Sequence, residues 1–219
     1  MKSVFIFTTI CSLTNIVPSI LGIKKFKLTH NKYHSFIVFL SIGAVSELIA
    51  RLLIIYHQYR YARILANFYI LFEGIVFLFI FFQWEAFKKK IILILFVFLF
   101  SAIWLIDSFI LKSFSKVNSL YSVIYSIIIV LFAIKLLQQE YFNNIKYSLK
   151  DPLVIISTML IINYSYRAVF ESLYLFKLDF TNEFYSDAFN IFVILNVISN
   201  FIFTYAIYCM DLRKRLILN

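Results

Sequence analysis

The chain has few of the residues that interrupt helices or cross-link a fold. Its 219 residues include only three glycines, two prolines and two cysteines. Scarce glycine and proline leave little material for linkers, re-entrant loops or helices broken within a membrane. Cys11 and Cys209 lie in the first and last apolar segments, where we expect small packing residues rather than a disulfide. Long, unbroken helices are therefore expected.

Charge is also scarce. Charged residues make up 15% of the chain against 63% hydrophobic residues, and the mean hydropathy is +0.89. This composition excludes an ordinary soluble domain. The formal net charge is +10, but the basic residues lie between apolar segments instead of along one amphipathic stripe. We therefore expect a chain surrounded by the lipid bilayer, with no nucleic-acid partner.

Signatures of catalysis and metal binding are missing. The sequence has no His-Glu-x-x-His pair, no Gly-x-Ser-x-Gly elbow and no glycine-rich phosphate loop. The histidines are His30, His34 and His57, and the first two belong to the opposite membrane edge from the third. We assign no catalytic residue, no metal and no cofactor, and a non-enzymatic function is favoured.

Seven apolar stretches are each long enough to span about 30 Å of hydrocarbon. They cover residues 3–23, 34–56, 64–84, 91–111, 119–137, 152–176 and 188–210. The connections are short, so the sequence predicts an all-α, polytopic membrane protein with residues 1–219 in one transmembrane domain. Pro18 is expected to bend the first helix without breaking it. Asp151 followed by Pro152 is typical of a helix start.

The distribution of lysine and arginine predicts the orientation. Thirteen of these 21 residues lie in or beside the connections on one side of the bundle, including the clusters Lys24 to Lys32 and Arg213 to Arg215. That side is predicted to be cytoplasmic, which places the N-terminus outside and the C-terminus inside. Because the positive charge follows the first apolar run and no Ala-x-Ala site closes it, we expect a retained helix rather than a signal peptide.

Five ionisable side chains fall inside the predicted spans, where charge is costly and usually functional. They are Glu47, Arg51, Glu73, Arg167 and Glu171. Two of the possible pairs, Glu47 with Arg51 and Arg167 with Glu171, are spaced i,i+4. Each of these pairs therefore projects from one helix face.

Depth suggests that these residues meet. Glu47, Glu73 and Arg167 each lie about nine residues, or about 14 Å, below the outer end of their helix. Asn196 lies at nearly the same level. A shallower layer contains Arg51, Asn67 and Glu171. The sequence thus predicts a polar cavity open to the outside, in which three carboxylates face two guanidinium groups and one carboxylate is in excess.

A structural interpretation stands beside this one, because polar side chains between transmembrane helices often only hold the bundle together. The sequence leaves open whether the charged cluster is a ligand site or an interhelical clamp. For the row Asn196, Asn200 and Thr204 the clamp is favoured. Tyr121 and Tyr125 are expected to line the cavity. Asp107, near a helix end, is expected to be solvated.

One resemblance is visible in the spacing of several residues. The third segment carries Asn67, Tyr69 and Glu73, and the sixth begins at Asp151-Pro152 and continues to Tyr164. This pattern resembles small uncharacterised seven-helix integral membrane proteins of Bacteroidota. The resemblance implies a multi-pass protein of the bacterial inner membrane and no particular reaction. In architecture the chain also resembles the seven-helix input modules of bacterial sensor kinases, but only Asp211 to Asn219 follow the last segment.

Three functions follow as hypotheses. The first is a non-enzymatic sensor or accessory module that binds a small polar or zwitterionic ligand and acts on a separate protein partner or within a homo-oligomer. The alternative is a small transporter or pore-forming subunit, which requires polar residues through the inner half as well. The third is a lipid-directed enzyme that uses Glu47 or Glu73 as a general base. A cavity closed on the cytoplasmic side favours the sensor over the transporter.

Overall fold

The computed structural model is helical throughout its described part. It describes the backbone of residues 2–111, 118–143, 150–176 and 180–217, and the side chains of residues 7–110, 118–142, 150–176 and 180–210. Within these ranges there is no strand. The Arg213 to Arg215 cluster lies outside the described side chains. The elements are α1 (Lys2–Leu13), α2 (Ile16–Lys25), η1 (Asn31–Tyr33), α3 (His34–Ile55), α4 (Tyr59–Gln83), α5 (Lys90–Leu105), η2 (Ile106–Leu111), α6 (Ser119–Asn143), α7 (Pro152–Leu175) and α8 (Asn182–Ile217).

Seven helical segments are long and apolar enough to cross a membrane, as the sequence predicts. They are Phe7–Lys25, Asn31–Ile55, Tyr59–Gln83, Lys90–Ile110, Ser119–Phe142, Pro152–Leu175 and Asn182–Met210. The all-helical fold with seven such segments is therefore confirmed. Several helices extend past the predicted spans, and α8 begins at Asn182 instead of residue 188. Hydropathy locates the apolar part of a helix and leaves out its polar first turn.

The first apolar segment is two helices instead of one. α1 and α2 meet at Thr14 and Asn15, where the backbone N–H groups of Thr14, Asn15 and Val17 bond to carbonyls three residues earlier. This spacing is that of a 3₁₀ turn. Pro18 has no N–H and so cannot donate to the carbonyl of Thr14, which a continuous α-helix requires. The prediction of a bent but unbroken helix is therefore wrong.

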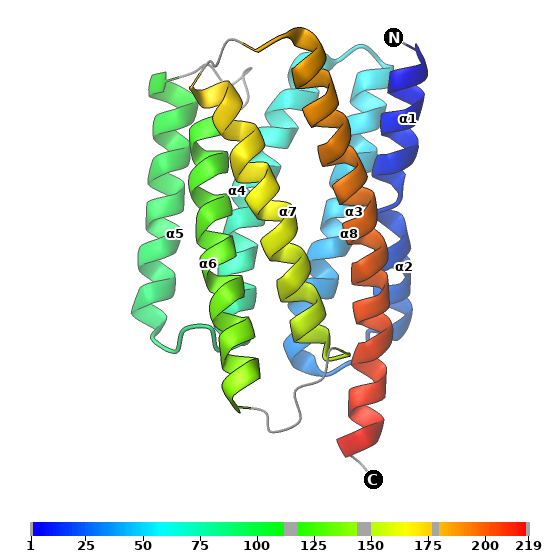
Figure 1. Ribbon diagram of the computed structural model, residues 1–219, viewed down its shortest axis with the longest axis vertical. Coiled ribbons are helices and arrows are strands. Elements are labelled where there is room, and N and C mark those ends of the chain that lie inside the picture. Colours follow the sequence, from blue (N-terminus) through cyan, green and yellow to red (C-terminus); the bar gives the residue numbers. More distant parts are fainter. Residues whose placement is uncertain (1, 112–117, 144–149, 177–179, 218–219) are drawn as a thin grey trace.

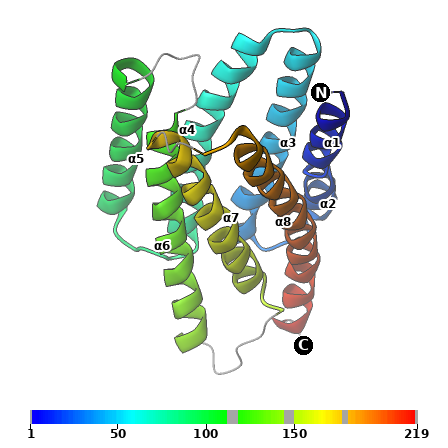
Figure 2. The same ribbon diagram turned by 45° about the horizontal axis from the view of Figure 1, so that its top comes forward.

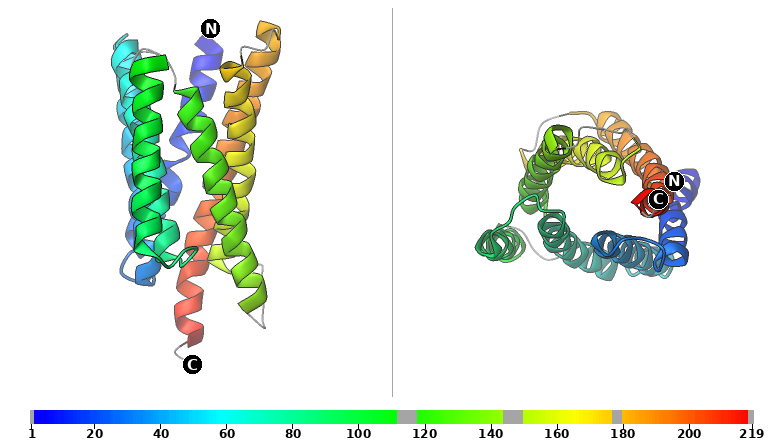
Figure 3. Two further views of the ribbon diagram at one scale, coloured as in Figure 1. Left: turned by 90° about the vertical axis from the view of Figure 1, so that its left-hand side faces the viewer. Right: turned by 90° about the horizontal axis from the view of Figure 1, so that it is seen from below.

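Seen along its long axis, the bundle is a ring of helices with one helix outside it (Figure 3). The ring runs α2, α3, α4, α6, α7 and α8, and α8 packs against both α1 and α2. α5 lies outside, against α4 and α6 (Figures 1 and 2). The N-terminus of α1 and the C-terminus of α8 lie at opposite ends of the bundle, hereafter its N-terminal and C-terminal ends (Figure 1).

α4 is held by a tight turn at each end. His57 and Glu85 have φ angles of 60° and 61°, in the left-handed region that favours glycine. The N–H of Gln58, which follows His57, bonds to the carbonyl of Leu53, and the N–H of Ala86, which follows Glu85, bonds to the carbonyl of Phe81. This is the Schellman arrangement that ends many helices. With so few glycines in the chain, residues that carry a Cβ occupy both positions.

α6 and α7 pack against each other, and small residues are buried on both helices. Ser122, Ser126 and Ala133 on α6 and Ser157 on α7 are all fully buried. Small side chains let two helix backbones approach closely, which is a common way for helices to associate in membranes. α6 therefore reaches α7 along much of its length and carries Tyr125 to the centre of the ring.

Asp107 is buried at the N-terminus of a neighbouring helix. Its carboxyl Oδ2 accepts a hydrogen bond of 3.0 Å from the backbone N–H of Tyr121, in the first turn of α6, and the residue is 0% exposed. Nearby, Asn118 Nδ2 donates to Ser108 Oγ at 2.7 Å. The first N–H groups of a helix have no acceptor within that helix, and the carboxylate of Asp107 in η2 provides the acceptor for the N–H of Tyr121. The expectation of a solvated Asp107 is therefore wrong.

Asp107→Ala is expected to lower the free energy of unfolding by about 1–2 kcal/mol, because the buried N–H of Tyr121 loses its acceptor. Thermal and denaturant unfolding of the purified protein in detergent measures this loss. Asp107→Asn is the matched control, since its amide oxygen can still accept the bond, and we expect it to retain most of the stability. Wild-type stability in Asp107→Ala would show that this cap contributes nothing.

Candidate functional site

A polar cavity lies inside the ring, between α1, α3 and α4 on one side and α7 and α8 on the other. Its volume is about 340 Å³. The charged and amide side chains that line it are Asn15, Glu47, Arg51, Glu73, Asn163, Arg167, Asn196 and Asn200. Pockets that bind small molecules commonly measure about 300–1,000 Å³, so this one suits a small compound.

Glu73 is the best-satisfied group in this cavity. Tyr164 Oη donates to its Oε1 at 2.7 Å, and Tyr125 Oη donates to its Oε2 at 2.9 Å. Arg167 Nη1 donates to the same Oε2 at 3.0 Å, which forms an ion pair between α4 and α7. Glu73 is buried, with 9% of its side chain exposed. Three helices therefore meet at one carboxylate.

Arg167 is held by aromatic rings as well as by charge. Its guanidinium carbon lies 5.1 Å from the centre of the Tyr125 ring and 5.9 Å from that of Tyr164. Cations at this range are attracted to the faces of aromatic rings. The two tyrosines thus bind both members of the pair, through their hydroxyls to Glu73 and through their rings to Arg167. The Glu73–Arg167 ion pair is therefore held in a fixed position in the bundle.

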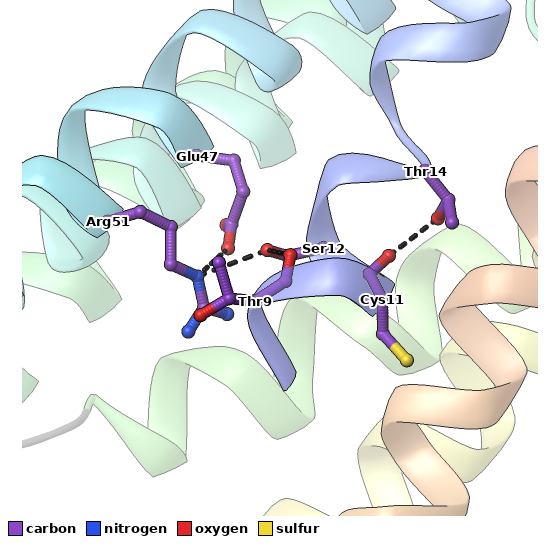
Figure 4. Close-up of polar contacts among 6 residues, drawn as sticks. All are labelled: Thr9, Cys11, Ser12, Thr14, Glu47 and Arg51. Atoms are coloured by element: carbon purple, nitrogen blue, oxygen red, sulfur yellow. Dashed lines mark hydrogen bonds and ion pairs between the residues drawn. The ribbon is translucent and has the colours of Figure 1, made fainter. Parts of the chain in front are cut away.

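The second ion pair is more open. Arg51 Nε donates to Glu47 Oε1 at 2.9 Å and also to Ser12 Oγ at 3.1 Å (Figure 4). Ser12 Oγ in turn donates to the carbonyl of Thr9, which fixes it on α1. The side chain of Glu47 is 35% exposed. In the described part of the chain Arg51 donates only through Nε, so its two terminal nitrogens remain available to a ligand.

Amide and hydroxyl groups connect the remaining helices around the cavity. Asn163 Nδ2 lies 3.3 Å from Asn196 Oδ1 and 3.1 Å from Ser199 Oγ, which joins α7 to α8. Asn200 Nδ2 donates to Thr14 Oγ1 at 2.8 Å, which joins α8 to the break between α1 and α2. These bonds join helices, whereas Thr204, the third residue of the row, donates to the carbonyl of Asn200 on its own helix.

An aromatic layer lies on the C-terminal side of the cavity. Phe39, Phe77 and Phe203 line it there. The ring centres of Phe39 and Phe77 are 4.6 Å apart, and Phe203 meets the buried Phe36 edge-on at 5.4 Å. All four residues are less than 8% exposed. The layer, hereafter the aromatic floor, separates the polar cavity from the apolar core beyond it.

The structure brings together five of the seven residues that the sequence singles out. Glu47, Arg51, Glu73, Arg167 and Asn196 all line the polar cavity. The expectation that Tyr121 and Tyr125 line it as well is wrong, since neither belongs to its lining. Within this lining the two glutamates are each paired with an arginine. The excess carboxylate expected from sequence is absent from the lining because the third acid, Glu171, does not belong to it.

Asn67 and Glu171 lie elsewhere. Asn67 is buried, and its carbonyl accepts a 3.0 Å hydrogen bond from Trp104 Nε1 of α5. Six residues separate it from Glu73, which is about 240° around an α-helix, so the two cannot share a face. Glu171 is half-buried and lies one turn beyond Arg167 toward the N-terminal end. Shared depth predicts a common level in the membrane but not a common direction.

Sequence reasoning missed several groups of this site. Ser12 and Asn15 of the first segment line the cavity and Thr14 accepts from Asn200, but the sequence pattern places none of them in an outward cavity. Tyr164 enters the sequence analysis only through the resemblance. Two signals were present. Tyr164 precedes Arg167 by three residues, which places both on one helix face, and Thr14 and Asn15 come just before Pro18 in an otherwise apolar run.

The cavity lining contains both charged groups and neutral hydrogen-bonding groups. It offers carboxylates, guanidinium groups, amides and hydroxyls from separate helices. In the described ranges no group of three or more His, Cys, Asp or Glu side chains could hold a metal ion. Both oxygens of Glu73 already accept hydrogen bonds, so it is poorly placed to act as a general base.

Comparison with known proteins adds no family. The chain matches no protein-family model, no curated protein sequence and no solved structure.

Proposed function

We propose that this protein is a membrane-embedded binding module that holds a small zwitterionic ligand in its polar cavity. The observation that carries the proposal is the half-open Glu47–Arg51 pair. Glu47 can accept from a ligand ammonium group, while the terminal nitrogens of Arg51 can donate to a ligand carboxylate. A zwitterion suits a lining in which the charges are balanced, because it adds no net charge to a site of low dielectric.

The proposed placement follows from the charge distribution along the chain. The N-terminal end of the bundle faces the outside and the C-terminal end faces the cytoplasm of a bacterium, with the lysine-rich connections inside. The cavity lies on the outer side of the aromatic floor, so the ligand enters from outside. Ligand binding then changes the packing of α1, α3 and α8, and a separate partner protein or a second copy of the chain responds to this change.

The aromatic floor favours a sensor or accessory role over transport. A transporter needs polar groups through the inner half of the bundle, and here the cavity ends on Phe39, Phe77 and Phe203. Transport remains the second candidate because of one observation, the broken first helix. Discontinuous helices at mid-membrane are a common feature of transporter binding sites, and Asn15 at this break lines the cavity.

The test is a stability screen of the purified protein in detergent with each of the common amino acids. A ligand at about ten times its dissociation constant adds about 1.4 kcal/mol of stability and raises the Tm by about 3–6 °C in a chain of this size. We expect at least one amino acid to give this response. Glu47→Gln and Arg51→Gln should abolish it, whereas Lys88→Gln, which removes an exposed charge outside the cavity, should not.

Two results would count against the proposal. The first is a wild-type protein whose Tm no amino acid raises. The second is a response that persists unchanged in Arg51→Gln, which would place the ligand elsewhere. Uptake of the responding amino acid into liposomes that contain the protein then separates the two candidate roles, because a sensor binds the compound without accumulating it and a transporter accumulates it with time.

A further inference from the structure

A second and larger hollow lies on the outside of the ring, between α2 and α3. Its volume is about 730 Å³, and it shares no lining residue with the polar cavity. Along α3 its wall consists mainly of Ile37, Val38, Ile42, Val45 and Ile49. Most of these side chains are exposed at the bundle surface. In the proposed placement this apolar groove faces the hydrocarbon of the membrane.

The C-terminal end of the groove is basic. Lys24 and Lys27 line it there and are both exposed. Lys25 lies between them in sequence but points to another side of α2, where its Nζ is 4.5 Å from the centre of the Tyr208 ring of α8. Lys24 in the last turn of α2 and Lys27 in the turn that follows it both line this groove. Two positive charges therefore stand at one end of a long apolar groove.

This end of the groove has a fixed structure. Phe26, which lines it, stacks on the ring of His34 with the ring centres 4.0 Å apart. The carbonyl oxygen of Phe26 lies 2.9 Å from His34 Nε2 and accepts a second bond of 3.0 Å from Thr29 Oγ1. The turn that carries Lys27 is thus tied to the start of α3.

We propose that this groove binds one anionic phospholipid, with its phosphate at Lys24 and Lys27 and an acyl chain along α3. The length of the groove matches that of an acyl chain in one leaflet, because Ile37 to Ile49 spans about 18 Å of helix and one leaflet of hydrocarbon is about 15 Å thick. The charge agrees as well, since basic pockets between helices at the cytoplasmic side commonly bind anionic headgroups. This lipid site is independent of the polar cavity and of its ligand.

Native mass spectrometry of the delipidated protein tests the proposal with two probes, dioleoyl phosphatidylglycerol and dioleoyl phosphatidylcholine. We expect the wild type to bind the first molecule of phosphatidylglycerol more tightly. The double variant Lys24→Gln/Lys27→Gln should weaken this binding by about 30-fold, because each lysine near an anionic lipid contributes a factor of about five. Both lysines are exposed, so the variant should fold normally.

Two further variants complete the test. Lys88→Gln/Lys89→Gln removes the same charge from exposed residues at the same end of the bundle and should bind phosphatidylglycerol like the wild type. Ile42→Trp fills the groove while both lysines remain and should lose this binding. Equal affinity for the two lipids, an equal loss in the Lys88/Lys89 control, or unchanged binding in Ile42→Trp would each overturn the proposal. So would a stable dimer in which a second copy covers the groove.

Discussion

Arg167→Met is expected to lower the free energy of unfolding by about 3–5 kcal/mol, because it leaves the buried carboxylate of Glu73 without its counter-charge. The two tyrosine hydroxyls on Glu73 would still donate, but neither carries a positive charge. Loss of the guanidinium also removes its contacts with both rings. Denaturant unfolding in detergent, at constant lipid and detergent concentration, measures the loss.

Two further variants test whether the loss of stability comes from the ion pair between Glu73 and Arg167. In Glu73→Gln/Arg167→Met both charges are gone, while the amide oxygen can accept from one tyrosine hydroxyl and the amide nitrogen can donate to the other, so we expect a smaller loss than in Arg167→Met alone. Arg51→Met is the matched control on the more exposed pair and should cost at most about 1 kcal/mol. If Arg167→Met costs no more than Arg51→Met, or the two single losses add in the double variant, Glu73 and Arg167 are not coupled as described.

Gly74→Ala is expected to destabilise the protein by about 1–3 kcal/mol, although alanine is the better helix former by about 1 kcal/mol. A Cβ at this position would collide with the hydroxyl of Tyr121 and lie 3.1 Å from Phe100 Cδ2. Tyr121 and Phe100 are both fully buried, so neither ring has space to move. Thermal unfolding of the purified variant measures the effect.

Gly43→Ala is the matched control. Its Cβ would meet Tyr69 Oη at 2.8 Å and Asn15 Nδ2 at 3.3 Å. Both residues border the polar cavity and can shift into it, so we expect a smaller loss of stability than in Gly74→Ala. If Gly43→Ala loses as much stability as Gly74→Ala, the freedom of the neighbouring side chains to move does not determine the loss of stability.

The sequence predicted the helices well and the side-chain partners only in part. An apolar run of about 20 residues has few alternatives to a helix in lipid, which is why all seven segments could be read directly. Position along a helix also showed that Glu73 and Arg167 share a level. The direction of a side chain depends on how each helix is rotated in the ring, and that rotation depends on packing with every neighbour. Asn67 lies away from the cavity lining for this reason.

Two other features depended on contacts between distant segments. Asp107 was expected to meet water because it lies near a helix end, but α6 returns over it and uses its carboxyl group as a cap. The break at Thr14 and Asn15 was underestimated because a single proline near the start of a helix is often tolerated. Its partner, Asn200, lies on the last helix, so no local pattern could reveal the bond.

The ring closes between the two ends of the chain. α8 seals it by packing against α1 and α2, and the hydrogen bond from Asn200 to Thr14 joins residues 186 positions apart in the sequence. Contacts of such long range form late, because most of the chain must be in place before they can be made. During synthesis the polar side chains of α1, α3, α4 and α7 therefore have an open flank until the last helix enters. The lining of the polar cavity is therefore complete only once α8 has packed against α1, α2 and α7.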